Sequence, residues 1–266
     1  SWTTLIVMDD LGDRDEIRRG CQALWQERGI LNASQAAWAG SMDVVQALQR
    51  MATSDLIPAS SVYTYVDTIK WVARGQILLD ALDIQSSVIA HLKAITAVTK
   101  HFPWSIELIL SHDQAFSRAL RQTWRDLQIA ATLKNQLEDL FPPAPDYKKG
   151  GQDILRGCMT YPLKALYDAL SYDEQKHLLR VLNEPNKDNR IVEQVIELFT
   201  AHKDVTDSLH RQLSSLSDRA IANFIQAVSI LPPECRNLPH TGWLQEWMFS
   251  YRELGNPNLK PVNEFS

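Results

Sequence analysis

The sequence predicts an all-α fold, and three observations carry this prediction. Apolar residues recur at three- and four-residue spacing in most of the chain, for example between residues 191 and 199. The 10 glycines and 12 prolines leave long uninterrupted segments between them. The sequence also lacks alternating apolar and polar residues flanked by Asn-Gly or Asp-Gly turns, the pattern typical of β-hairpins. We therefore expect a bundle of amphipathic helices.

In the first half of the chain, prolines separate the expected helices. Apolar residues at helical spacing predict one helix around residues 44–51 and another around residues 88–95. Residues 55–58 (Asp-Leu-Ile-Pro) should separate the first of these from a further helix, because the residue before a proline is disfavoured in the α conformation. Pro103 should end or kink the helix that precedes it.

The second half contains the largest interruption, at residues 141–151, where prolines, lysines and glycines follow a helical stretch. Pro162, Pro185 and the Pro-Pro pair at 232–233 mark later boundaries. Neither a fixed-period repeat nor a shift in composition divides the chain. We therefore expect a single domain over residues 1–266, with residues 141–151 as a functional loop.

Composition and charge exclude several classes of protein. The 266 residues are 45% hydrophobic and 22% charged, as in an ordinary globular chain. A net charge of −5 without a basic block argues against a nucleic-acid partner. The apolar stretches fall well short of the roughly 20 residues of a membrane helix, so we expect no integral membrane segment. Three widely spaced cysteines and the lack of a signal peptide favour a reducing, cytoplasmic location.

An acidic segment near the N-terminus holds the most informative chemistry. On a helix, Asp9 and Asp13 lie four residues apart on one face, with Asp10 beside them. Carboxylates this close repel each other unless a cation lies between them, and oxygen ligands of this kind suit Mg²⁺. Arg18 and Arg19 follow within two helical turns, and arginine binds phosphate oxygens with two parallel hydrogen bonds. The segment therefore suits a diphosphate bound together with metal.

The spacing of this segment, DDxxDxxxxRRG, resembles the first aspartate-rich motif of the trans-isoprenyl diphosphate synthases, the farnesyl and geranylgeranyl diphosphate synthase family. Weaker matches follow in the order of the family, at Gly75-Gln76 and at Lys93. Residues 127–139 fit the frame of the second aspartate-rich motif, with Asn135 and Gln136 where two aspartates are expected and Asp139 retained.

The resemblance continues beyond the second motif and covers essentially the whole chain. Lys148 and Asp153 match a lysine and a Gly-x-Asp step, and residues 157–162 match Gly-Lys-x-Thr-x-Pro with Cys158 in place of the lysine. The family has helices before its first motif, whereas this sequence begins eight residues before Asp9, so we expect the chain to lack them. The resemblance implies an isoprenoid synthase-type helical bundle around a central cavity.

The resemblance also implies a role for each matched residue. The two motifs would lie on facing helices and hold Mg²⁺ through Asp9, Asp10, Asp13, Asn135 and Asp139. Arg18, Arg19, Lys148 and Asp153 would bind the substrate, Lys93 and Lys148 would reach the leaving diphosphate, and Gln76 would lie near the carbocation. Because Asn135 and Gln136 bring no charge, metal affinity at the second motif should fall.

The implied activity is that of a Mg²⁺-dependent prenyltransferase, which ionises an allylic prenyl diphosphate and joins it to isopentenyl diphosphate or another acceptor, as a homodimer. A terpene cyclase on the same fold is an alternative, although the Asn-x-x-x-Ser-x-x-x-Glu pattern usual in cyclases is absent, since Asn135 is followed by Asp139 and Pro143. A non-catalytic partner subunit is a third possibility, against which the intact first motif argues.

The residues before Asp9 bear on product length. In this fold the growing chain runs beside the helix that carries Asp9, and Leu5, Thr4 and Ser1 would lie one to two turns deeper on the same face. None of the three is aromatic, and Trp2 is the residue expected to close the pocket. We therefore expect an allylic substrate or product of 20 or more carbons.

Overall fold

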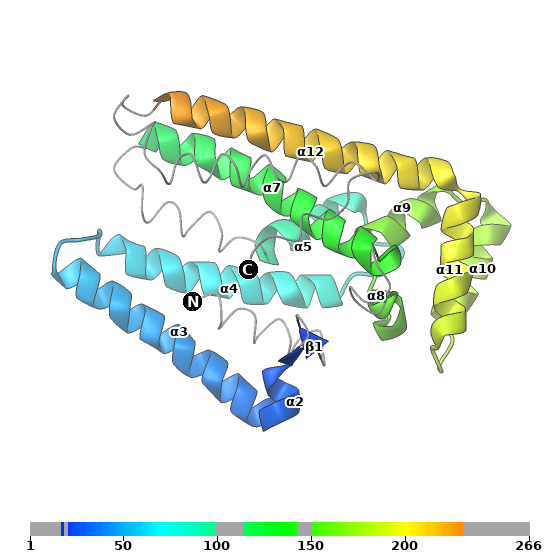
Figure 1. Ribbon diagram of the computed structural model, residues 1–266, viewed down its shortest axis with the longest axis horizontal. Coiled ribbons are helices and arrows are strands. Elements are labelled where there is room, and N and C mark those ends of the chain that lie inside the picture. The colour runs from blue at the N-terminus through cyan, green and yellow to red at the C-terminus, as the bar shows by residue number, and fades with distance from the viewer. Residues whose placement is uncertain (1–16, 19–20, 99–113, 143–149, 231–266) are drawn as a thin grey trace. The chain divides into compact units, whose positions relative to one another are not determined.

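A computed structural model describes residues 17–18, 21–98, 114–142 and 150–230 of the chain. Within these ranges it contains ten helices and one pair of two-residue strands (Figure 1), so the predicted all-α class is confirmed. The chain divides into two compact units, Ser1–Ile69 and Lys70–Ser266, and the division falls inside helix α4 (Ser60–Asp80).

The first unit begins with a short antiparallel strand pair. Strand β1 (Ile17–Arg18) pairs with β2 (Cys21–Gln22), with Arg18 opposite Cys21. The expectation that Arg18 continues a helix from the acidic segment is therefore wrong. The helix was predicted from the spacing of the three aspartates, which says nothing about the residues after Asp13. Arg18 adopts the extended backbone that strand pairing requires.

Two helices follow the strand pair, α2 (Leu24–Arg28) and α3 (Ile30–Thr53). Gly29 separates them at a φ of 80°, a conformation that glycine adopts without strain. The predicted break at residues 55–58 is confirmed, because α3 ends at Thr53 and α4 begins at Ser60.

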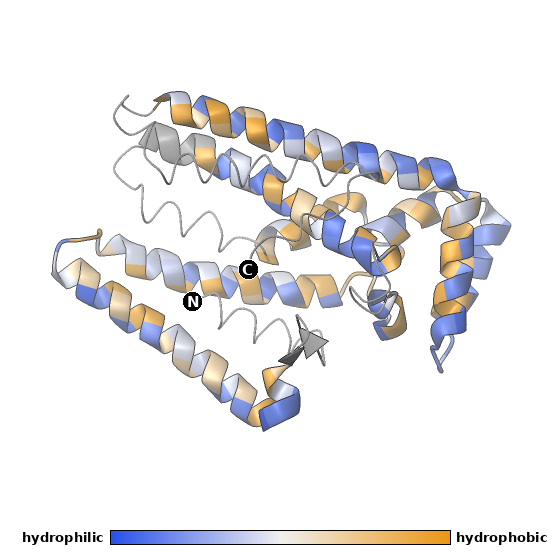
Figure 2. Cartoon of the chain, viewed as in Figure 1, coloured by the Kyte–Doolittle hydropathy of each residue, from blue (hydrophilic) through white to orange (hydrophobic). Residues whose placement is uncertain are grey.

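The second unit is built around two long helices, α7 (Gln114–Leu140) and α12 (Lys203–Ile230), which lie side by side and antiparallel (Figure 1). Both helices carry hydrophobic and hydrophilic residues, as Figure 2 shows for all of α12 and for α7 beyond its grey start, and this is typical of amphipathic helices. Helix α5 (Val88–Val98) packs on α7. The end of α4 approaches α5 closely, since a Cβ on Gly75 would lie 2.4 Å from the backbone nitrogen of Val98.

Four shorter helices complete the second unit, and caps or prolines define their boundaries. Thr160 caps the helix that starts with the Tyr161-Pro162 step, and Ser171 forms a capping box with Glu174. Pro185 lies between two helices, as predicted. The four helices are α8 (Gln152–Arg156), α9 (Tyr161–Ala169), α10 (Tyr172–Leu182) and α11 (Asn189–Ala201).

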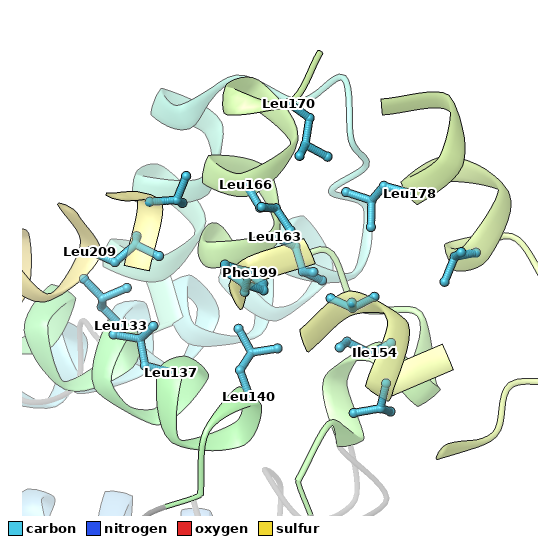
Figure 3. Packing of buried hydrophobic residues seen from close by; sticks show 14 of the residues in the cluster. Leu133, Leu137, Leu140, Ile154, Leu163, Leu166, Leu170, Leu178, Phe199 and Leu209 are labelled. Carbon is cyan, nitrogen blue, oxygen red and sulfur yellow. The ribbon is translucent and has the colours of Figure 1, made fainter. Parts of the chain in front are cut away.

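One hydrophobic core lies where the end of α7 meets the short helices (Figure 3). Leu137 and Leu140 of α7, Ile154 of α8 and Phe199 of α11 are among its buried members. This packing sets the position of α8 and of the turn that follows it. Among the described residues, no helix is both long enough and apolar enough to span a membrane.

Candidate functional site

The C-terminal half of α7 carries the predicted second motif, and its three polar residues have different environments. Asn135 is exposed, Gln136 is partly buried, and Asp139 is buried with 4% of its surface exposed. Thr132 precedes Asn135 by three residues and Gln128 precedes Thr132 by four, so the same face continues with neutral oxygen-bearing side chains. The motif pattern in the sequence did not indicate these two residues.

Asp139 joins α7 to the start of α8. Its Oδ1 accepts a hydrogen bond from the backbone N–H of Gln152 at 3.2 Å, and its Oδ2 accepts one from the N–H of Asp153 at 3.1 Å. The carbonyl oxygen of Asp139 accepts a third, from the N–H of Gly151 at 2.6 Å. These donors lie at the N-terminus of α8, where unpaired N–H groups favour a negative charge. We call this arrangement the Asp139 clamp.

Gln136 holds the start of α9 in a similar way. Its Oε1 accepts a hydrogen bond from the backbone N–H of Tyr161 at 3.3 Å. The hydroxyl of Tyr161 in turn donates to Oε1 of Gln212 on α12 at 2.9 Å. Burial raises the pKa of Tyr161, so its hydroxyl stays protonated over the physiological range. The amide of Gln136 therefore serves to connect α7 to α9.

The turn between α8 and α9 contains the segment that resembles Gly-Lys-x-Thr-x-Pro. Gly157 ends α8 at a φ of 80°, and the exposed thiol of Cys158 follows it. The carbonyl of Asp153 accepts a hydrogen bond from the N–H of Cys158 at 2.8 Å. Asp153 therefore lies in the first turn of α8, partly buried, with its backbone bonded to both Asp139 and Cys158.

The other predicted residues are spread over several elements. Gln76 lies on α4, where its Nε2 donates to Oδ1 of Asp80 at 3.2 Å, and Lys93 is exposed on α5. Arg18 lies in β1. The remaining residues, Asp9, Asp10, Asp13, Arg19 and Lys148, lie outside the described ranges, as do Ser1, Trp2, Thr4 and Leu5. Their roles stay predictions, as does the facing arrangement of the two motifs.

The donor set on α7 fits a divalent cation less well than the sequence suggests. In the described part of the chain, no three His, Cys, Asp or Glu side chains converge on a possible metal site. The Gln136 oxygen and both carboxylate oxygens of Asp139 accept backbone hydrogen bonds. A carboxylate oxygen that accepts one hydrogen bond keeps a second lone pair, so the clamp leaves Asp139 able to bind metal through that lone pair.

A buried polar cluster that the sequence did not predict lies beside α9. His91 of α5 is 1% exposed, and its ring meets the edge of Tyr161 at a centroid distance of 6.4 Å. Burial, and then the nearby charge of Lys164, lower the pKa of His91, which favours the neutral imidazole. Lys164 itself is 8% exposed and pairs with Asp168 at 2.6 Å. The i,i+4 spacing of Lys164 and Asp168 is the one signal that the sequence offered for this cluster.

A second buried cluster connects the two long helices. Asp126 of α7 is 3% exposed and accepts a hydrogen bond from the guanidinium of Arg219 at 3.2 Å. Side-chain amides of Gln122 and Asn223 donate to its other oxygen at 3.4 and 3.5 Å. A cavity of about 450 Å³ opens beside Arg219, and none of the predicted site residues lines it. Its lining residues share one face of α12: His210, Arg211, Ser214, Ser215, Asp218 and Arg219.

The fold is that of solved isoprenoid synthases. A decaprenyl diphosphate synthase from Rhodobacter capsulatus matches 95% of this chain and 75% of its own, at 18% identity and a TM-score of 0.75. A polyprenyl synthase from Caulobacter crescentus CB15, complexed with calcium and isoprenyl diphosphate, matches 95% of this chain and 73% of its own, at 20% identity and a TM-score of 0.73. A geranylgeranyl pyrophosphate synthetase from Pyrococcus horikoshii Ot3 matches 94% of this chain and 75% of its own, at 18% identity and a TM-score of 0.72.

At 18–20% identity, these structures show the fold of the chain, an isoprenoid synthase-type helical bundle. The polyprenyl synthetase family model matches residues 2–199. The chain therefore belongs to the polyprenyl synthetase family, whose members are usually enzymes. No curated protein sequence matches the chain.

Proposed function

We propose that this protein is a Mg²⁺-dependent prenyltransferase that ionises an allylic prenyl diphosphate and joins it to isopentenyl diphosphate or another acceptor. The observation that supports this most is the acidic segment Asp9, Asp10 and Asp13, complete in a chain that belongs to the family. Mg²⁺ bound by these carboxylates supplies the positive charge that stabilises a departing diphosphate.

The chain's own residues would orient the substrate. Arg18, Arg19 and Lys148 bring the positive charge that binds diphosphate oxygens, and Lys93 reaches the leaving group. Gln76 would lie near the carbocation, where its amide oxygen offers a partial negative charge without acting as a nucleophile. Asp153 would be positioned by the Asp139 clamp at the start of α8.

The α7 residues support a second candidate, a non-catalytic partner subunit. Asn135 is neutral, and the oxygens of Gln136 and Asp139 already accept backbone hydrogen bonds. If α7 holds no metal, the diphosphate is neutralised less completely, and ionisation becomes slow. The chain would then bind substrate without turning it over.

One incubation separates the candidates. The purified protein is given Mg²⁺ and an allylic diphosphate, with and without isopentenyl diphosphate, and the products are identified. A prenyltransferase elongates the substrate when isopentenyl diphosphate is present, and we expect products of 20 or more carbons. A cyclic hydrocarbon formed without isopentenyl diphosphate would indicate a cyclase. Retention of unreacted, bound diphosphate would indicate the partner subunit and overturn the proposed activity.

We also propose a homodimer, supported by apolar side chains on α3. Leu31 and Trp38 are 70% and 69% exposed, and their seven-residue spacing places them on one face of the helix together with Met42. An apolar stripe of this kind is typical of a protein interface. Sedimentation at micromolar concentration should give a dimer, and Trp38→Glu should shift it towards the monomer. A monomeric wild-type protein would contradict the proposal.

A further inference from the structure

The turn after α8 lacks the lysine of the family pattern, but it lies beside another lysine. Cys158 stands where Gly-Lys-x-Thr-x-Pro has its cation. Lys187, in the loop between α10 and α11, places its ammonium against the same turn, since a Cβ built on Gly157 would lie 2.7 Å from Lys187 Nζ. The ammonium can approach this closely because Gly157 has no side chain.

Contacts at the N-terminal end of α8 hold this helix in place beside the loop that carries Lys187. At the N-terminal end, a Cβ on Gly151 would lie 2.3 Å from Cγ1 of Val192, so α8 packs tightly on the first turn of α11. The Asp139 clamp holds the same end of α8 to α7. Helix α8 is therefore fixed to both α7 and α11, and the loop that carries Lys187 leads directly into α11.

The acids around Lys187 are engaged elsewhere. Glu184 and Asp188, in the same loop, both pair with Arg190, at 3.6 and 3.8 Å. Asp188 also caps α11 by accepting the backbone N–H of Arg190 at 3.0 Å. Within the described ranges, no carboxylate forms an ion pair with Lys187, whereas Lys134, Lys164 and Lys203 each pair with an acid four residues on. Lys187 is partly buried and keeps its charge available for an anion.

We propose that Lys187 supplies the positive charge that the turn lacks at Cys158 and contacts a phosphate group of the diphosphate substrate. This inference rests on the proposed function. The ammonium of Lys187 reaches the turn from a different part of the sequence. It therefore provides the positive charge that the family lysine would provide at position 158. Lys187 is then a substrate-binding residue that the motif pattern cannot reveal, because it lies 29 residues beyond Cys158.

Binding of inorganic pyrophosphate in the presence of Mg²⁺, measured by calorimetry, tests the inference. Lys187→Ala should weaken binding by about tenfold, the expected loss of one charged hydrogen bond. Adding Cys158→Lys to Lys187→Ala should restore binding, since it returns the lysine to its family position. Lys203→Ala, which removes a lysine paired with Asp207 on α12, is the matched control and should bind as the wild type does.

Each remaining outcome overturns a defined statement. If the wild type does not bind pyrophosphate, the proposed function fails, and this inference fails with it. If Lys187→Ala binds as the wild type does, the role of Lys187 alone is wrong. If Lys187→Ala weakens binding and Cys158→Lys does not restore it, whether or not the Tm falls, then Lys187 acts by stabilising the carbonyl end of α8 and does not contact the substrate.

Discussion

Helix α7 carries two buried aspartates, Asp126 and Asp139, and their partners differ in kind. Asp126 accepts hydrogen bonds from the guanidinium of Arg219 and the amide of Asn223, both on α12. Asp139 accepts from backbone N–H groups at the start of α8. The first aspartate joins two long helices through side chains, whereas the second positions a short helix through its backbone. Both contribute to the packing of the second unit, so a buried acid on α7 is not by itself a sign of metal binding.

The largest expected effect distinguishes these acids from those near the N-terminus. Asp9→Ala or Asp10→Ala should abolish turnover, because each removes a carboxylate that holds Mg²⁺ at the leaving diphosphate. Product formation under saturating substrate measures this effect. Asp207→Ala, which removes an acid of α12 paired with Lys203, is the control and should retain activity. Full activity in Asp9→Ala would refute the proposed metal site.

The next effect tests the Asp139 clamp. Asp139→Ala should lower the free energy of unfolding by about 2 kcal/mol, because the N–H groups of Gln152 and Asp153 lose their acceptor. Urea denaturation measures the change. The neighbouring Glu138→Ala breaks a partly exposed pair with Lys134 at 3.3 Å and should cost less than about 1 kcal/mol. Equal losses in the two variants would contradict the clamp.

A smaller effect is expected where charge is returned to α7. Asn135→Asp should keep or raise turnover, and should lower the Mg²⁺ concentration for half-maximal activity by up to about tenfold, or about 1.4 kcal/mol. The exposed position of Asn135 allows this substitution without repacking the core. Loss of activity in Asn135→Asp would mean that the neutral side chain is a specialised feature, and would favour an unusual acceptor or cyclisation.

The smallest expected effect is a difference in salt dependence between the side-chain partners of Asp126 and the backbone partners of Asp139. Arg219 is 60% exposed at its side chain, so its attraction to Asp126 is screened by salt. The destabilisation caused by Asp126→Asn should therefore shrink, by less than about 1 kcal/mol, between low salt and 1 M NaCl. Asp139→Asn should show no such dependence, because its partners are backbone amides. Equal salt dependence in the two variants would remove the distinction between them.

The sequence predicted the helices well because their signals are local. Hydrophobic spacing and prolines located α3, α5 and α11 and the breaks around Pro58, Pro162 and Pro185. The strand pair at Arg18 was not predicted, since two residues of strand leave no periodic pattern. The first acidic motif could be recognised from its spacing alone.

The environment of the second motif could not be predicted in the same way. The amide donors that Asp139 receives depend on where α8 begins, and the start of α8 packs closely on Val192 of α11. The approach of Lys187 to Gly157 depends on a loop whose position the sequence does not encode locally. These contacts join residues far apart in the chain, and a single sequence holds no pattern that pairs them.

The Asp139 clamp also has a consequence for how the protein opens. Helix α8 has five residues, far fewer than an isolated helix needs to be stable in water. Its first amides are protected by a carboxylate on α7, so we expect α8 to lose stability when the last turn of α7 unfolds. The amide hydrogens of Gln152 and Asp153 should therefore show the same opening free energy in hydrogen exchange as those at the end of α7, as one cooperative unit. Opening of that unit would release the turn at Gly157 and Cys158 while α12 remains folded.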